Sequence, residues 1–157
     1  MDTNGILYLS NDDVKKVLDL GRAVAITEQA LRDHSEGRVT WSTPEDFAIK
    51  PEQGWQSWVT GCALKSSSVA GFRIRSIKAT GGSRDLSLTP RGPRRVLILS
   101  DLEGGEIVAF MDEDWCHAVR TAAAATVAMR VLARKGASVM AMLGAGDTAR
   151  AAVPVMA

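Results

Sequence analysis

The chain has 157 residues, of which 46% are hydrophobic and 24% are charged, as in a folded globular protein rather than a disordered one. A formal net charge of +1 argues against a nucleic-acid or membrane partner, because both are bound chiefly by strongly basic surfaces. The two cysteines are too few for a disulfide framework, residues 1–4 do not resemble a secretory leader, and no apolar run approaches the roughly 18 residues of a membrane span. We therefore expect a cytoplasmic protein.

The first forty residues predict a short strand followed by two helices. Residues 5–9 form an apolar run that favours a buried strand. Ser10 followed three residues later by Asp13 indicates a capping box, which opens a helix at the next residue. Gly21 interrupts the helical pattern, a second helix follows it, and Gly37 provides a C-terminal stop.

The middle of the chain predicts short strands separated by proline, glycine or serine. They are residues 47–49, 56–61, 69–77 and 96–99, with the last continuing into 106–111 as a hairpin. Because side chains alternate along a strand, Arg73 and Arg75 share one face of the third of these, and Phe72 and Ile74 share the other. Residues 80–95 are rich in Pro, Gly and Arg and indicate a loop.

The last third of the chain predicts a long helix, a strand and a second helix. Residues 115–134 are rich in alanine and apolar nearly all the way round, so we expect this helix to be buried. Arg120 inside it would then need a charge partner, either a buried carboxylate of the protein or that of a substrate. An apolar strand at residues 138–143 and a helix at 147–157 follow.

The turn between that strand and that helix, residues 144–149, matches the dinucleotide-binding fingerprint G-x-G-x-x-G/A. Gly144 would make the tight turn, Gly146 would let the backbone approach a pyrophosphate, and Ala149 would allow close packing of helix and strand. The alternative is a glycine-rich turn that binds no ligand. The residue that reads the ribose would lie past Ala157, and one βα unit cannot complete a parallel sheet, so we expect a longer natural protein or a second chain.

Several segments, in order along nearly the whole chain, resemble the ornithine cyclodeaminase/mu-crystallin family. They are Leu7 to Val14, Gly37-Arg38-Val39, Ala70-Gly71-Phe72-Arg73, Leu99 to Asp112, Arg120-Thr121-Ala122-Ala123, Leu132-Ala133-Arg134 and Leu143-Gly144-Ala145-Gly146. The resemblance implies an α/β fold class. An α+β substrate-binding and dimerisation domain (residues 1–115) would be joined by a connecting helix (116–136) to the first βα unit of a Rossmann-like NAD(P)-binding domain (137–157).

The same resemblance implies an NAD- or NADP-dependent enzyme that acts on an amino acid or cyclic imine, as a cyclodeaminase, amino-acid dehydrogenase or ketimine reductase, and that forms a homodimer. The implied substrate-binding residues are Arg73, Arg120 and Thr89; the implied cofactor-binding residues are Gly144, Ala145, Gly146, Asp147, Thr148 and Thr121. The catalytic aspartate of the family would lie beyond Ala157, so no catalytic residue is assigned. The alternatives are a non-catalytic ligand-binding or dimerisation module, or an enzyme fragment that needs its C-terminal half.

Two departures from the family pattern bear on the substrate. The strand cation is usually lysine, whereas this chain has Arg73. The family often has an arginine shortly after the proline near the first strands, but here Pro44 is followed by Glu45 and Asp46, which suggests a substrate with an extra amine. Cys116 and His117 form an adjacent pair with no second cluster at ligand spacing, so we expect no metal site. The tryptophans suit a core or dimer interface; they are Trp41, Trp55, Trp58 and Trp115.

Overall fold

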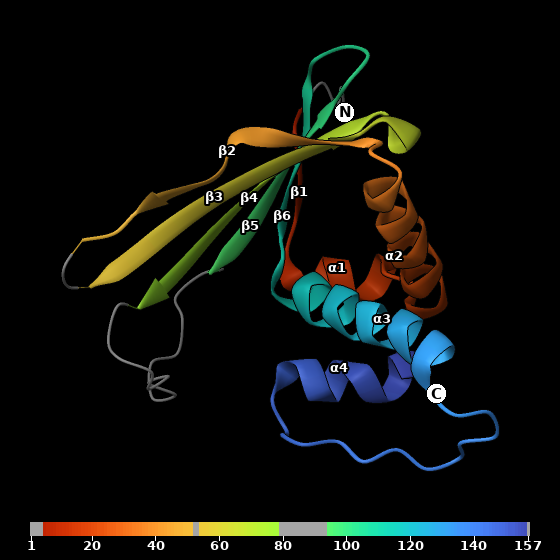
Figure 1. The fold of residues 1–157 in the computed structure, drawn as a ribbon. Helices are drawn as coiled ribbons and strands as arrows, with labels where there is room; N and C mark the ends of the chain where they lie inside the picture. Colours follow the sequence, from red (N-terminus) through yellow and green to blue (C-terminus); the bar gives the residue numbers. More distant parts are fainter. Residues whose placement is uncertain (1–4, 52–53, 79–93, 157) are drawn as a thin grey trace.

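The computed structural model describes residues 5–51, 54–78 and 94–156, which form one six-stranded sheet and a group of helices (Figure 1). The elements are β1 (Leu7–Leu9), α1 (Asn11–Val17), α2 (Leu20–Ser35), β2 (Val39–Ile49), β3 (Trp55–Leu64), the 3-10 turn η1 (Lys65–Ser67), β4 (Val69–Lys78), β5 (Arg95–Asp101), β6 (Ile107–Asp112), α3 (Asp114–Leu132) and α4 (Asp147–Met156). Thr89 lies outside the described residues.

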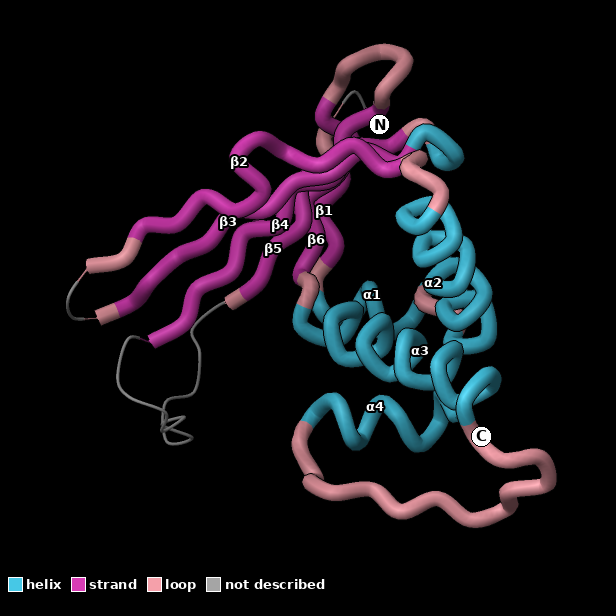
Figure 2. Tube along the Cα trace, in the orientation of Figure 1, coloured by secondary structure: helices cyan, strands magenta, loops and turns pink. Residues whose placement is uncertain are grey.

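The sheet has the strand order β1-β6-β5-β4-β3-β2. All neighbouring strands run antiparallel except β1 and β6, which are parallel. The predicted hairpin is therefore confirmed as β5 and β6, and the predicted strands at 56–61 and 69–77 are the central parts of β3 and β4. Figure 2 shows the helices gathered to one side of the strands, with α3 continuing from the end of β6.

Local capping signals position the first two helices as expected. The Ser10 hydroxyl accepts a hydrogen bond from the Asp13 backbone, and the Asp13 carboxylate accepts one from the Ser10 backbone at 3.2 Å, which completes the capping box. The expected interruption at Gly21 is wrong, because Gly21 lies in the first turn of α2, after its N-cap Asp19. Gly37, with a φ of +70°, follows the end of α2 in the left-handed conformation that glycine adopts most easily.

The hydrophobic core lies between α2, α3 and α4. It is built largely from small residues, which let helices approach closely; they are Ala23, Val24, Ala118, Val119, Ala122, Ala123, Ala151, Ala152 and Val155. The expectation that the whole of residues 115–134 is buried is wrong for the C-terminal end. The helix ends at Leu132, and Val131 and Leu132 are 79% and 80% exposed.

The strand expected at residues 138–143 is absent. The segment is exposed, and no strand in the described part of the chain pairs with it. A β-strand depends on hydrogen bonds to a neighbouring strand, so an apolar run of the right composition stays irregular without one. The helix expected after the glycine turn is confirmed as α4, which packs on α3.

The buried carboxylate of Asp33 links α2 to η1, the turn between β3 and β4. Asp33 is 1% exposed and accepts hydrogen bonds from Ser66 of η1 at 2.6 Å, Arg38 at 2.7 Å and Gln29 at 2.8 Å. These bonds, led by that from Ser66, lower the pKa of Asp33 to about 2. Because the buried Asp33 carboxylate accepts hydrogen bonds from three side chains of the chain itself, we assign it a structural rather than a binding role.

The sheet face that carries Phe72 and Ile74 is not covered by any described helix, and we call it the open face. Register places Tyr8, Phe47, Ile49 and Trp55 on the same side. These six side chains are 37–61% exposed. The predicted alternation along β4 is therefore confirmed, but its apolar side is the exposed one and its arginine side faces α3.

Among the described residues, no helix is long and apolar enough to cross a membrane.

Candidate functional site

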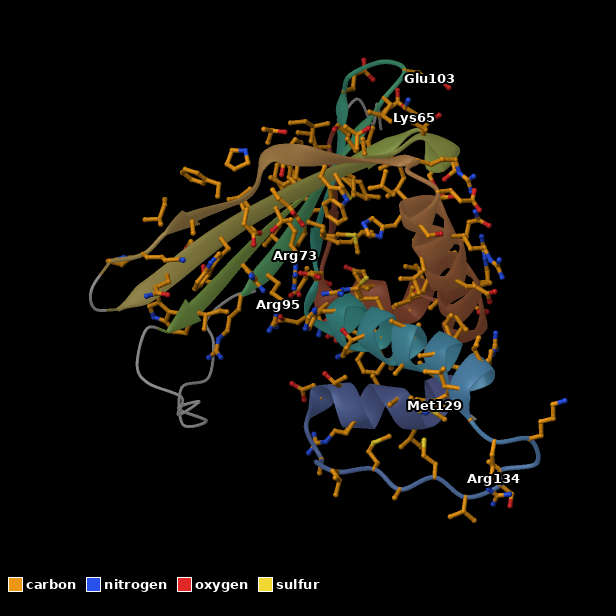
Figure 3. The ribbon with its side chains drawn as sticks, viewed as in Figure 1. Lys65, Arg73, Arg95, Glu103, Met129 and Arg134 are labelled. Atoms are coloured by element: carbon orange, nitrogen blue, oxygen red, sulfur yellow. The ribbon has the colours of Figure 1, made fainter. Side chains whose placement is uncertain are left out.

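Side chains from β4, β5 and the first two turns of α3 meet on the covered side of the sheet. We call this set the arginine cluster; it consists of Arg73, Arg95, Glu113, Asp114, His117 and Arg120. Figure 3 shows Arg73 and Arg95 reaching from the strands toward the start of α3. The helix begins within two residues of the end of β6, so the chain itself carries Glu113 and Asp114 to this position.

Glu113 is the buried centre of the cluster. Its carboxylate is 3% exposed and accepts a 2.6 Å hydrogen bond from Nε of Arg73, whose side chain is 20% exposed. Nε of Arg120 lies 3.7 Å from the other carboxylate oxygen. A buried carboxylate needs such compensation, because an unpaired charge away from water is very costly.

His117 joins the two arginines on the other side. Its Nδ1 accepts hydrogen bonds from Nη2 of Arg73 at 3.1 Å and from Nη2 of Arg120 at 2.7 Å. A ring nitrogen accepts only when it carries no proton, so His117 is neutral with its proton on Nε2. Burial, followed by the charges of Arg120, Arg95 and Arg73, lowers the pKa of His117 to about 4.

The cluster keeps unused donors that suit an external carboxylate. Arginine has five N–H groups, and within the described part of the chain Arg73 uses two of them, one on Glu113 and one on His117. Arg120 has a half-exposed side chain and donates one hydrogen bond in the described part of the chain. Two guanidinium groups held together in this way match the geometry of a planar carboxylate.

The structure thus brings together Arg73 and Arg120, which come from β4 and α3. Arg120 is not buried as expected, because it emerges from α3 on the side that faces solvent near the cluster. Thr121, expected at the cofactor, donates its hydroxyl to the His117 carbonyl at 2.7 Å. Of the other predicted cofactor residues, Gly144, Ala145 and Gly146 lie in the exposed turn before α4, where Gly144 has a φ of +101°. Asp147 and Thr148 are the first two residues of α4 and are also exposed.

Glu113 and His117 were missed as site residues by reasoning from sequence alone. Glu113, His117 and Arg120 are four and three residues apart, a spacing that places them on one face of a helix. That signal was available, but only the sheet shows that the same helical face meets Arg73. Burial, with the nearby Glu113 charge, raises the pKa of the Cys116 thiol, which leaves it protonated at neutral pH. No group of three or more metal-ligand side chains occurs within residues 5–51, 54–78 and 94–156.

The lowered pKa of His117 predicts a loss of stability at acid pH. The unfolded chain binds a proton at an ordinary histidine pKa of about 6.5, whereas the folded chain resists it until about pH 4. The free energy of unfolding should therefore fall as the pH drops from about 6.5 to about 4, by up to about 3 kcal/mol from this group. Urea unfolding of the wild type and of His117→Asn across this pH range measures the fall in the free energy of unfolding. Equal pH slopes in the two proteins would contradict the assignment.

The fold and the cluster define an α/β protein with a cluster of arginines between a mixed sheet and α3, the longest of the described helices. The chain matches the ornithine cyclodeaminase/mu-crystallin family over residues 7–157 and belongs to that family.

Three relatives illustrate the similarity. The nodulation efficiency protein NfeD of Rhizobium meliloti is 31% identical over 143 residues, covering 90% of this chain and 42% of its own length. A Δ(1)-pyrroline-2-carboxylate reductase of Bacillus cereus is 24% identical over 147 residues, covering 92% of this chain and 43% of the reductase. An archaeal alanine dehydrogenase dimer with bound NAD superposes with a TM-score of 0.80 at 25% identity, covering 96% of this chain and 44% of that one. The chain thus spans less than half the length of these relatives.

Proposed function

We propose that the whole protein is an NAD(P)-dependent enzyme that acts on an amino acid or cyclic imine. The observation that carries the proposal is the pair Arg73 and Arg120, which both donate to His117 and keep further N–H donors unused within the described part of the chain. In this proposal the two guanidinium groups bind the substrate carboxylate and so orient the α-carbon, and orientation of this kind supplies much of an enzyme's rate. Membership of the family, and the names of the reductase and dehydrogenase relatives, support this choice of substrate class.

The turn before α4 fits a dinucleotide pyrophosphate. A Cβ built on Gly144 or Gly146 would meet nothing within 4 Å, so a ligand can approach the backbone there closely. α4 begins directly after this turn and presents its unsatisfied N–H groups. Gly144, Ala145, Gly146 and Thr148 would hold the pyrophosphate, with Asp147 and Thr121 as further candidates at the cofactor. The nicotinamide, when bound, supplies hydride exchange with the substrate carbon.

We also propose the division into a sheet domain (residues 1–115), a connecting helix (116–136) and the start of a nucleotide-binding domain (137–157). The open face would be the homodimer interface, because it gathers large apolar side chains with no helix over them. The alanine dehydrogenase dimer supports this oligomeric state. The two free cysteines of the chain agree with a cytoplasmic location.

Nicotinamide absorbance tests the enzymatic proposal. The full-length protein, NAD or NADH, and a panel of amino acids and cyclic imines would be followed spectroscopically while product is measured separately. A dehydrogenase or reductase changes the absorbance in proportion to product. A cyclodeaminase makes product with no net absorbance change, because it returns the hydride within each turnover. Absence of both product and nicotinamide binding would leave a non-catalytic binding or dimerisation module.

A further inference from the structure

Among the described residues, one cation beside the arginine cluster has no acidic partner. Arg75 lies two residues from Arg73 on the same face of β4 and next to Arg95 of β5. Its Nε is buried and makes no hydrogen bond, and no salt bridge to Arg75 occurs in the part of the chain that the structure describes. A buried guanidinium nitrogen without an acceptor is costly, so the position indicates a group from outside the protein.

The neighbouring arginines differ from Arg75 in this respect. Arg73 is paired with Glu113, and Arg95 is paired with Asp114 at 2.8 Å. Arg120 lies beside Glu113. Among the described residues, four guanidinium groups therefore lie beside two paired carboxylates, whereas the charge of the whole chain is nearly balanced at +1. His117 adds no charge at neutral pH, since its pKa is lowered to about 4. The excess positive charge on this face suits a ligand with more than one negative group.

The indole ring of Trp58 contacts Arg75 and also lies near a second cation, Lys50. Trp58 lies directly opposite Arg75 in the β3–β4 register, and the guanidinium carbon sits 5.4 Å from the centre of the indole. Nζ of Lys50 lies 5.9 Å from the same ring. The indole attracts both cations, yet neither has a carboxylate partner among the described residues. Two like charges at one ring are stabilised further when an anion binds between them.

The acidic residue on this sheet face is a weaker candidate for recognising the substrate. Asp46 lies opposite Thr60, which is in turn opposite Arg73, and the Thr60 hydroxyl already donates to it. Asp46 is also exposed, so water solvates its charge. The extra amine suggested by the Glu45-Asp46 pair would therefore meet a solvated carboxylate that already accepts one hydrogen bond, whereas an anion would meet an arginine whose buried Nε has no acceptor.

We propose that Arg75 is a specificity-determining residue that binds a second anionic group of the substrate. This inference rests on the proposed function, in which Arg73 and Arg120 bind the α-carboxylate. The Cα atoms of Arg73 and Arg75 are about 6.6 Å apart, two residues along an extended strand. A short side chain ending in a carboxylate can bridge the two arginines. The substrate class is then an acidic amino acid, or the imine derived from it, rather than an amino acid with an apolar or basic side chain.

Binding of simple carboxylates tests the site without relying on turnover. Succinate and butyrate have the same carbon count, but only succinate has a second carboxylate. Calorimetry on the full-length protein should show succinate binding about tenfold to a hundredfold more tightly than butyrate, as expected for charge-assisted hydrogen bonds. Arg75→Gln should remove the preference and leave butyrate binding unchanged. Arg75→Lys should keep part of it. The control Arg22→Gln, at an exposed position in α2, should keep all of it.

Equal affinity for succinate and butyrate in the wild type, or an unchanged succinate preference in Arg75→Gln, would overturn the proposal. A competition panel decides the nature of the second group. L-Aspartate, L-glutamate and O-phospho-L-serine should bind better than L-2-aminobutyrate, and the strongest of the three identifies carboxylate or phosphate. Tighter binding of L-ornithine than of these three would also overturn it. If the enzymatic proposal alone is wrong, NAD titration gives no heat while the succinate preference persists.

Discussion

Replacing Arg73 with methionine should lower kcat/KM by about a hundredfold or more, because the change removes charged hydrogen bonds to the substrate carboxylate worth about 3 kcal/mol. The fall in kcat/KM should appear mainly as a higher KM, since the substrate carboxylate is bound both before and during the reaction. Steady-state kinetics on the full-length protein measure it. Arg120→Met should also lower kcat/KM. Because Arg120 is half-exposed, its loss should cost less stability.

A double variant separates binding from folding in this experiment. Arg73→Met alone leaves the Glu113 carboxylate buried, with Arg120, 3.7 Å away, as its one remaining arginine partner among the described residues. It should therefore destabilise the protein by about 3 kcal/mol, within the range for breaking a buried ion pair. Arg73→Met combined with Glu113→Gln removes both charges and should restore much of the stability but none of the activity. Recovery of activity in the double variant would mean that Arg73 acts only as the partner of Glu113.

Introducing charge on the open face should convert the proposed homodimer to a monomer. Phe72→Asp combined with Ile74→Asp would place two desolvated carboxylates at the centre of the interface, and the dissociation constant should rise by at least about a thousandfold. Sedimentation analysis over a range of protein concentrations measures it. Phe72 lies on β4, an inner strand of the sheet, and its ring covers Gly61 of β3, where a Cβ would come within 2.8 Å of it.

Ile26→Asp provides the matched control for the dimer experiment. Ile26 is 59% exposed, like the residues of the open face, but it lies on α2 rather than on the sheet. It should leave the dimer unchanged. If the double aspartate variant still sediments as a dimer, or if both variants dissociate, the open face is not the interface.

Local chemistry explains what could be predicted from the sequence. The Ser10 capping box, the glycine after α2, the β5–β6 hairpin and the start of α4 all depend on residues a few positions apart, and each is found as expected. Alternation along β4 likewise separates Arg73 and Arg75 from Phe72 and Ile74, because it follows from the geometry of any strand. Arg73 and Arg120 were singled out by family resemblance, and the structure places them within reach of one histidine.

The remaining features depend on contacts between distant parts of the chain. Residues 138–143 have the composition of a strand, but pairing decides whether a strand forms, and no described strand lies beside them. Which side of β4 is covered depends on where α3 packs, so the apolar side is the open one. Glu113 and His117 acquire their places only when α3 meets β4, because a charge network is defined by atoms in contact rather than by spacing along the chain. Sequence alone thus determined the local elements, such as the capped helices and the β5–β6 hairpin, and the two-faced character of β4. Tertiary packing decided which faces meet and which cation, Arg75, remains without an acidic partner among the described residues.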